Sequence, residues 1–391
     1  MNNNTIPNNI TLSEWNMEIT TSLLPNIIIL SVYLVLGICG NVFVLMVYAF
    51  QMKKVSDERH FIPILAFFDM IATLYLGVHY IVQCFYQTTF SNNILCKTLV
   101  FFVANTTYYS VFILFIIAIQ RYMKLCMLQK PSMSILMRRT ALFLAILLSA
   151  LFALPLPFIY GTIKYQSTDY GISGMRCGRL KEGSGVIMTL YSIGFGMYVF
   201  VLVTTLIVIY SKILKTVFRN LKEHKSDTTG STKEIEKTDG DGSRPDIGCK
   251  EIEVSIISAK AAKQAMIPET STDSVGQHVS RSPVANTVES ALSGKRRTRN
   301  EITRKITIMF FIITTVFVLC YIPKVTILCL EGIYDGFWEN LSSSLRPAVT
   351  FLYHIFIINN IVNPLIYAFM DIEFRDNAVI FLKRMFNSCM K

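Results

Sequence analysis

Residues 347–370 read PAVTFLYHIFIINNIVNPLIYAFM and contain no Asp, Glu, Lys or Arg. A helix needs about 20 mostly apolar residues to cross the hydrocarbon core of a bilayer, so this stretch is long enough to span a membrane. Its second half also carries Asn359, Asn363 and Pro364. The stretch therefore predicts a transmembrane helix with polar residues inside it.

Six earlier stretches share this length and this scarcity of charge, and the one at 61–86 contains a single charged residue, Asp69. The whole chain is 52% hydrophobic and only 16% charged, with a mean hydropathy of +0.46, which points to lipid as its solvent. In lipid the spans must be helices, because a β-barrel would show short alternating segments instead. We predict an all-α membrane protein, a seven-transmembrane helix bundle. The predicted spans lie near residues 25–50, 61–86, 97–121, 139–161, 186–212, 304–330 and 347–370.

Lysine and arginine fix the orientation, because they accumulate in cytoplasmic loops. Of the 37 basic residues, 30 lie in the loops and the tail on the face of the C-terminus, and the first 52 residues contain none. The N-terminal tail (1–24) is therefore predicted outside and the C-terminal segment (371–391) inside, as in a multi-pass protein of the plasma membrane. The net charge of +11 reflects this topology and does not require nucleic acid as a partner.

Glycosylation sequons agree with this orientation. Asn3, Asn9 and Asn340 each begin an Asn-x-Ser/Thr triplet on the predicted outer side. A fourth triplet, at Asn105, lies within a span and out of reach of the transferase. We expect the three outer sites to be glycosylated.

The long third cytoplasmic loop has a different composition. Between Arg219 and Met309 there is no Phe, Tyr or Trp. Such a segment cannot bury enough apolar surface to offset its ordering entropy, so residues 225–295 are predicted to be disordered. The two ends of the loop are expected to continue the fifth and sixth helices.

Five short motifs occur in order, each in a different span: GN at 40–41, LAFFD at 65–69, QRY at 120–122, FVLCYIP at 317–323 and NPLIY at 363–367. In these motifs the chain resembles the rhodopsin-like (class A) family of G-protein-coupled receptors. The resemblance covers all seven spans and extends to the stretch 371–386, which is similar to the family's short amphipathic helix. It implies a receptor, not an enzyme, that binds an extracellular ligand and activates a heterotrimeric G protein. Arrestin and receptor kinases are implied as further partners.

The resemblance implies a sodium site at Asp69. A carboxylate within a membrane helix is costly unless it has partners. Ser110, Asn359 and Asn363 match the rest of the family's sodium-binding cluster, and oxygen ligands suit a hard cation. The alternative is an Asp69 kept neutral by protonation.

The resemblance also assigns a switch around Arg121, although a basic residue at a helix end can simply extend to the interface. The implied switch residues, with the hinge prolines, are Gln120, Arg121, Tyr122, Tyr210, Tyr321, Pro323, Asn363, Pro364 and Tyr367. Gln120 departs from the family, which has an acidic residue before the arginine, and Tyr321 replaces its tryptophan. Thr303 also stands where some members carry an acidic partner. We therefore expect signalling without ligand, unless Glu301 serves as the partner of Arg121.

The outer face is expected to carry the ligand site. Cys96 and Cys177 match the family's disulfide, which would hold the second outer loop over a cavity. Gly171 and Gly174 in that loop suit a hairpin. The residues that border the cavity in the family correspond to His79, Gln83, Val103, Thr107, Lys324, Tyr353 and His354.

Two ligand classes are disfavoured by single residues. Amine receptors of the family carry an Asp where this chain has Val103, and opsins carry a lysine where it has Ile357. A cationic outer loop with Arg176 and Arg179 favours a peptide, with a lipid or another anionic small molecule as the alternative. Lys324 would either pair with an anionic group or extend to the interface.

Other classes of membrane protein fit less well. A channel or transporter needs a continuous polar path and usually repeated halves, and we find no internal repeat. An enzyme needs a paired nucleophile and base or metal-ligand spacing, and neither occurs in the sequence.

Overall fold

The computed structural model describes residues 10–52, 56–57, 59–127, 133–167, 170–180, 185–235, 283–334 and 336–389. Asn3 and Asn9, two of the predicted glycosylation sites, lie outside these residues. The chain divides into two compact units. The first comprises residues 1–217 and 300–391, and the second, residues 218–299, holds the end of one helix and the beginning of another.

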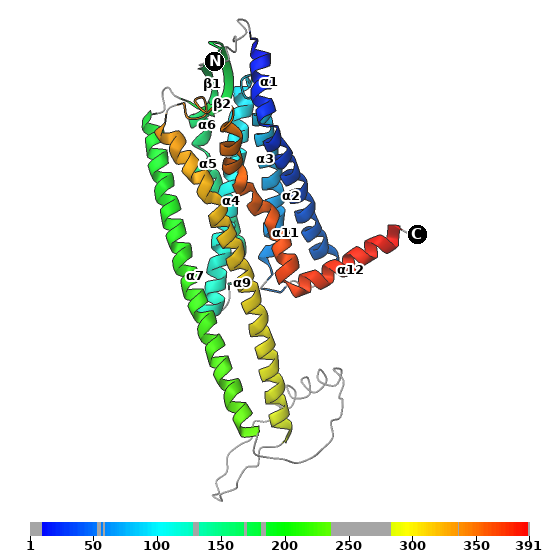
Figure 1. The fold of residues 1–391 in the computed structure, drawn as a ribbon. Coiled ribbons are helices and arrows are strands. Elements are labelled where there is room, and N and C mark those ends of the chain that lie inside the picture. Colours follow the sequence, from blue (N-terminus) through cyan, green and yellow to red (C-terminus); the bar gives the residue numbers. More distant parts are fainter. Residues whose placement is uncertain are drawn as a thin grey trace, which may run out of the picture. The chain divides into compact units, whose positions relative to one another are not determined.

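Among the described residues, seven helical segments are long and apolar enough to cross a membrane, which confirms the predicted bundle (Figure 1). Each predicted span falls on one of them. In chain order they are α2 (Leu24–Phe50), α3 (Phe61–Phe85), α4 (Asn93–Cys126), α5 (Ile135–Ala153) with α6 (Leu156–Ile159), α7 (Gly185–Ile235), α9 (Pro283–Ile333) and the pair α10 (Arg346–His354) and α11 (Asn359–Met370).

The ends of several helices differ from the predicted ones for local reasons. The third span begins earlier, because Asn92 caps α4 by accepting a hydrogen bond from Leu95 N at 3.0 Å. The fourth span is not one helix. It is interrupted before Pro155, which has no N–H to donate and whose ring crowds the carbonyl four residues earlier, so that a proline kinks or breaks a helix.

The third cytoplasmic loop was predicted to be disordered over 225–295. Helix α7 continues to Ile235 and α9 starts at Pro283, so both ends of that range are helical. Residues 236–282 lie outside the described part of the chain.

The seventh span is divided by the 3-10 turn η1 (Ile355–Ile358). Helix α11 then runs through Pro364 without interruption. The break in the seventh span therefore lies before Asn359, while Pro364, one of the two predicted hinge prolines, lies inside a continuous helix. A stretch of 3-10 helix within a longer helix is frequently a functional hinge.

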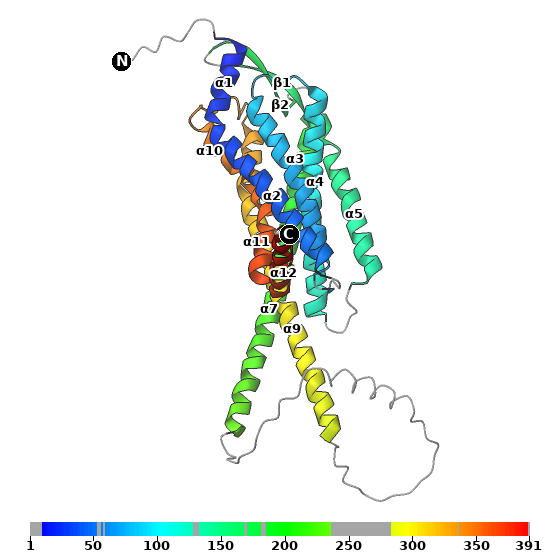
Figure 2. The same ribbon diagram turned by 90° about the vertical axis from the view of Figure 1, so that its right-hand side faces the viewer.

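A helix that was not predicted, α1 (Leu12–Ser22), lies within the expected N-terminal tail. Thr11 and Glu14 form a capping box at its start. Trp15 is buried, and its ring centroid lies 5.3 Å from that of Tyr165. Helix α1 therefore packs beside the outer hairpin, as both views show (Figures 1 and 2).

The hairpin expected in the second outer loop is confirmed. Strands β1 (Tyr160–Gln166) and β2 (Ser173–Arg179) pair antiparallel, with Thr162 opposite Cys177. Gly171 has a φ of 66°, a left-handed conformation that favours glycine. The expected C-terminal helix is also present as α12 (Ile372–Cys389).

Candidate functional site

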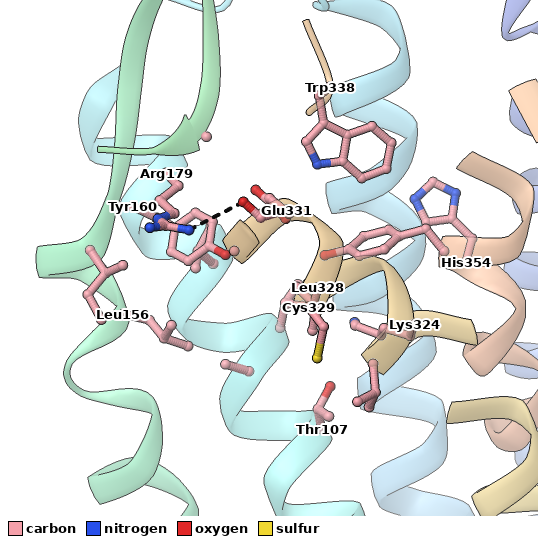
Figure 3. Close-up of a pocket in the computed structure, with 18 of the residues that line it drawn as sticks. Thr107, Leu156, Tyr160, Arg179, Lys324, Leu328, Cys329, Glu331, Trp338 and His354 are labelled. Carbon is pink, nitrogen blue, oxygen red and sulfur yellow. Dashed lines mark hydrogen bonds between the residues drawn. The ribbon is translucent and has the colours of Figure 1, made fainter. Parts of the chain in front are cut away.

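A cavity of about 1160 Å³ opens between the helices on the outer side. All seven residues predicted to border it do so, which brings together side chains from α3, α4, α9 and α10. In Figure 3, Thr107 and Lys324 lie at the lower end of the view, and Arg179, Glu331 and Trp338 lie above them.

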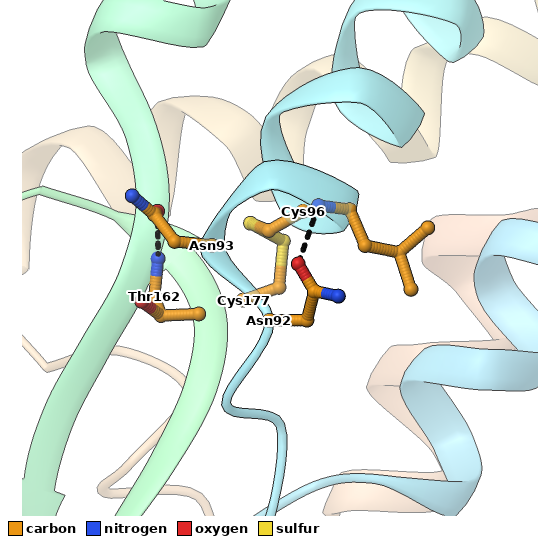
Figure 4. Close-up of a disulfide and its surroundings, with 6 residues drawn as sticks. Asn92, Asn93, Cys96, Thr162 and Cys177 are labelled. Atoms are coloured by element: carbon orange, nitrogen blue, oxygen red, sulfur yellow. Dashed lines mark hydrogen bonds between the residues drawn. A yellow bond between two sulfur atoms is a disulfide. The ribbon is translucent and has the colours of Figure 1, made fainter.

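The hairpin is fastened to α4 beside this cavity. Cys96 and Cys177 form the expected disulfide. Next to it, Asn93 Oδ1 accepts a hydrogen bond from Thr162 N at 3.1 Å (Figure 4). Cys84 is buried and free. A covalent bond and a hydrogen bond therefore hold the loop at the mouth of the cavity.

The mouth carries charges of both signs. Arg176 forms an ion pair with Glu339 at 2.9 Å, and Arg179 donates to the backbone carbonyl of Glu331 at 3.4 Å. Arg346 also lines the cavity. The cationic mouth predicted from the sequence is thus partly neutralised by acidic residues that the prediction had not considered.

Lys324 does not extend to the interface. Its side chain turns into the bundle, where Nζ donates to the Tyr80 hydroxyl at 3.1 Å. The same ammonium lies 3.4 Å from the centroid of the Phe356 ring and 5.2 Å from that of Tyr353. Tyr80 and Phe356 were not predicted, because nothing in the sequence links them to Lys324.

The four residues of the predicted sodium site surround a second, much smaller cavity of about 10 Å³. Asn363 Nδ2 donates to Asp69 Oδ2 at 2.6 Å. The Oδ1 atoms of Asn359 and Asn363 are buried and have no hydrogen-bond partner among the described residues. With the Ser110 hydroxyl, these oxygens fit the needs of a small hard cation.

Asn41 compensates for Pro364. A proline has no N–H to donate to the carbonyl four residues earlier, here that of Asn360. Asn41 Nδ2 donates to this carbonyl instead, at 2.7 Å. A Cβ at Gly40 would lie 3.2 Å from the Pro364 ring, so the small residue permits the close approach of α2 and α11. The GN and NPLIY motifs therefore act as one contact.

The switch residues lie in the same inner half. Arg121 is fully buried, and its guanidinium lies 4.9 Å from the centroid of the Phe310 ring. The Tyr210 hydroxyl donates to the Phe310 carbonyl at 3.4 Å and lies 2.8 Å from the Thr314 hydroxyl. Tyr367 is also fully buried. Its hydroxyl has no hydrogen-bond partner in the described part of the chain.

The remaining switch residues stand apart from this group. Tyr321 packs between rings, with centroid distances of 4.4 Å to Phe317 and 5.2 Å to Phe356. It also lines the large cavity and so connects the ligand region to the inner half. Tyr122 lies at the cytoplasmic end, with Lys212 Nζ 5.8 Å from its ring centroid.

The family described as the 7 transmembrane receptor (rhodopsin family) matches residues 40–367. The chain belongs to this family. It is 22% identical over 381 residues to a cholecystokinin receptor of Xenopus laevis, across 93% of this chain and 77% of that protein. The crystal structure of squid rhodopsin matches with a TM-score of 0.54 and 18% identity, over 89% of this chain and 77% of that one, which supports the fold.

Rhodopsin-family receptors are multi-pass membrane proteins and not enzymes, as the sequence predicted. In this receptor the cytoplasmic edge contains two buried arginines that the sequence had shown only as topology signals. Arg59 Nε and Nη2 donate to the Asp371 carboxylate at 2.7 and 2.9 Å, and Nη1 pairs with Glu373 at 2.6 Å. Burial disfavours the charge of Arg59, but the hydrogen bond and charge of Asp371 outweigh it and raise the pKa of Arg59.

The second arginine, Arg138, joins the first cytoplasmic loop to α5. Its Nη2 pairs with Asp57 Oδ1 at 2.9 Å, and this hydrogen bond lowers the pKa of Asp57. The backbone carbonyl of Asp57 accepts a hydrogen bond from Gln120 Nε2 at 3.2 Å. Gln120 of the receptor's QRY motif is therefore tied to the loop, and its Oε1 has no partner among the residues described.

Proposed function

We propose that this receptor binds an extracellular peptide in the large cavity and, in response, activates a heterotrimeric G protein. The observation that carries the proposal is the size of the cavity. Sites for small molecules usually occupy about 300–1000 Å³. The volume of about 1160 Å³ is above that range, and the cavity opens toward the outer hairpin.

The chemistry of the mouth supports a peptide. Arg176, Arg179, Glu331 and Glu339 offer charges of both signs around an aromatic interior. A peptide presents amides and charges of both signs, whereas a lipid would leave such groups without partners. The relative named as a cholecystokinin receptor is a peptide receptor, which favours the same ligand class.

The inner half supports coupling to the G protein. When the ligand binds, Tyr321 and Pro323 would transmit the change at the cavity along α9 toward the cytoplasmic side. The 3-10 turn η1 would transmit it along the seventh span. Arg121 would then leave Phe310 and meet Tyr210 and Tyr367. A sodium ion held by Asp69, Ser110, Asn359 and Asn363 would favour the resting arrangement. Arrestin and receptor kinases would act on the active receptor from the cytoplasm.

The test is a screen of secreted peptides on cells that express the receptor with a promiscuous G-protein reporter. We expect peptide fractions that activate the wild type but not an Arg121→Ala variant present at the same surface level. Digestion of the fractions with protease should abolish the response. Activity that survives protease and extracts into organic solvent would replace the peptide by a lipid. Ion flux without a reporter signal would contradict the receptor mechanism.

A further inference from the structure

Lys324 lines the cavity from the outer half of α9, directly after Pro323. The residue is 8% exposed, and its ammonium is surrounded by Tyr80, Tyr353 and Phe356. An ammonium has three donors. One is used by the Tyr80 hydroxyl, and ring faces stabilise the charge only partly, since they do not accept a full hydrogen bond.

The chain supplies no carboxylate to this ammonium within the part that the structure describes. The buried arginines Arg59, Arg138 and Arg176 each form an ion pair, and Lys324 forms none with a described residue. The acidic residue on the same face of α9 is Glu331, seven residues further out. At 1.5 Å per residue it lies about 10 Å away along the helix axis, too far for an ion pair.

Two histidines stand beside the same end of the cavity, each with one ring nitrogen that has no hydrogen-bond partner among the described residues. His79 and His354 are 4% and 5% exposed, and both line the cavity. Their rings pack on the Tyr80 ring, with centroids 4.9 and 4.2 Å away. The Nδ1 atom of each is buried without a hydrogen-bond partner among the described residues. Each imidazole can donate one hydrogen bond even when it is neutral.

An aromatic layer lies below these groups on the side of α9. Tyr321, one turn deeper on α9, packs against Phe317 and Phe356. This layer limits the room directly below Lys324. The end of a chain fits such a position with fewer steric clashes than a chain that must turn back on itself.

We propose that the deep end of the cavity is a subsite for a terminal carboxylate, which pairs with Lys324 and accepts hydrogen bonds from His79 and His354. This inference deepens the proposed function, because it states which end of the ligand enters first. A carboxylate supplies the missing counter-charge and several acceptor positions at once. The C-terminus of a peptide and the head of a fatty acid share this chemistry.

The first test needs no natural ligand. The full-length receptor is purified in detergent, and its thermal unfolding is followed with 3-phenylpropionate or its neutral counterpart 3-phenylpropanamide, each up to about 20 mM, since a ligand of the folded state raises the melting temperature. We expect the acid to stabilise the wild type more than the amide does. Lys324→Met should weaken binding of the acid at least tenfold. Lys324→Arg should retain the preference for the acid, and Lys97→Met, outside the cavity, serves as the matched control.

Equal effects of acid and amide on the wild type would overturn the subsite. So would a preference for the acid that survives Lys324→Met, or one that is lost equally in Lys97→Met. His79→Gln and His354→Gln should each reduce the preference by less than Lys324→Met does, because neither removes the charge.

The second test separates the two proposals. Peptide pools with free C-termini, the same pools with amidated C-termini, and long-chain fatty acids are compared in the reporter assay. Activity confined to free-acid peptides supports both proposals. Activity of fatty acids alone supports the subsite while the peptide proposal fails. Activity of amidated peptides alone overturns the subsite and leaves the peptide proposal standing.

Discussion

Arg59 and Lys324 are both buried cations. Arg59 lies at the cytoplasmic edge of the bundle and Lys324 in its outer half, and only Arg59 has carboxylate partners in the described part of the chain. Arg59 has two hydrogen bonds to Asp371 and an ion pair to Glu373. Lys324 has a tyrosine hydroxyl and aromatic rings. A buried charge is costly unless it is paired. The first cation therefore belongs to the fold, and the second is left for water or for a ligand to satisfy.

The largest effect is expected from Arg59→Met. This change leaves the Asp371 carboxylate, whose side chain is 0% exposed, buried without its arginine. Removing one partner of a buried ion pair costs about 3–5 kcal/mol. We expect a loss of this size in the free energy of unfolding of the purified receptor, and lower surface expression in cells. Arg375→Met, at an exposed position of α12, is the matched control and should change little.

The same substitution at Lys324 sharpens the comparison. Lys324→Met removes a buried charge that has no carboxylate partner among the described residues. The free energy of unfolding without ligand should therefore stay within about 1 kcal/mol of the wild-type value. Both variants are measured by thermal unfolding in the same detergent. Comparable losses at Arg59 and Lys324 would mean that Lys324 is as much a part of the fold as Arg59.

A smaller effect is expected from Gln120→Asp, which adds a carboxylate beside Arg121 in the chain. A charge-assisted hydrogen bond is roughly twice as strong as a neutral one. A gain of about 1–2 kcal/mol for the resting state would lower the active population about five- to thirtyfold. We expect ligand-independent second-messenger output, normalised to surface expression, to fall by that factor relative to the wild type.

Two controls accompany this measurement. Arg121→Ala should sharply reduce coupling with any agonist. Glu301→Gln should leave basal output unchanged if the residue before Arg121 sets the resting state. If Gln120→Asp leaves basal output unchanged or raises it, while Glu301→Gln raises it, the acidic partner of Arg121 is on α9 and the wild-type Gln120 is not the cause of basal signalling.

The sequence was sufficient for features that depend on local patterns. Charge-free stretches located the seven spans, and the motifs brought Asp69, Asn359 and Asn363 to one small cavity, as the structure shows. The hairpin followed from its glycines. Each of these features depends on a short sequence pattern that lies within one segment of the chain or matches a motif of the family.

The features that the sequence did not reveal depend on contacts between distant segments. Arg59 and Asp371 are 312 residues apart, and the charge of Arg59 alone predicts only a cytoplasmic loop. Tyr80 and Phe356 look like ordinary core residues until the fold places them against Lys324. The 3-10 turn at Ile355–Ile358 contains no proline, so no residue in the sequence indicated a break in the seventh span at this place.

The smallest effect concerns Asp57, whose partner Arg138 is buried as Arg59 is, but whose own side chain is 57% exposed. Solvent screening should limit the contribution of this pair to below about 1 kcal/mol. The pKa of Asp57 is lowered, mainly by its hydrogen bond to Arg138, so the contribution is present above the unfolded pKa of about 3.9 and is lost as the pH falls through the lower folded value. Asp57→Asn keeps the backbone carbonyl that Gln120 binds and removes only the charge. We expect this variant to have a slightly lower melting temperature than the wild type at pH 7. The difference in melting temperature should disappear as the pH falls below about 4. If the difference in melting temperature stays constant down to about pH 3, the geometry of the hydrogen bond, and not the charge of Asp57, holds the loop to α5.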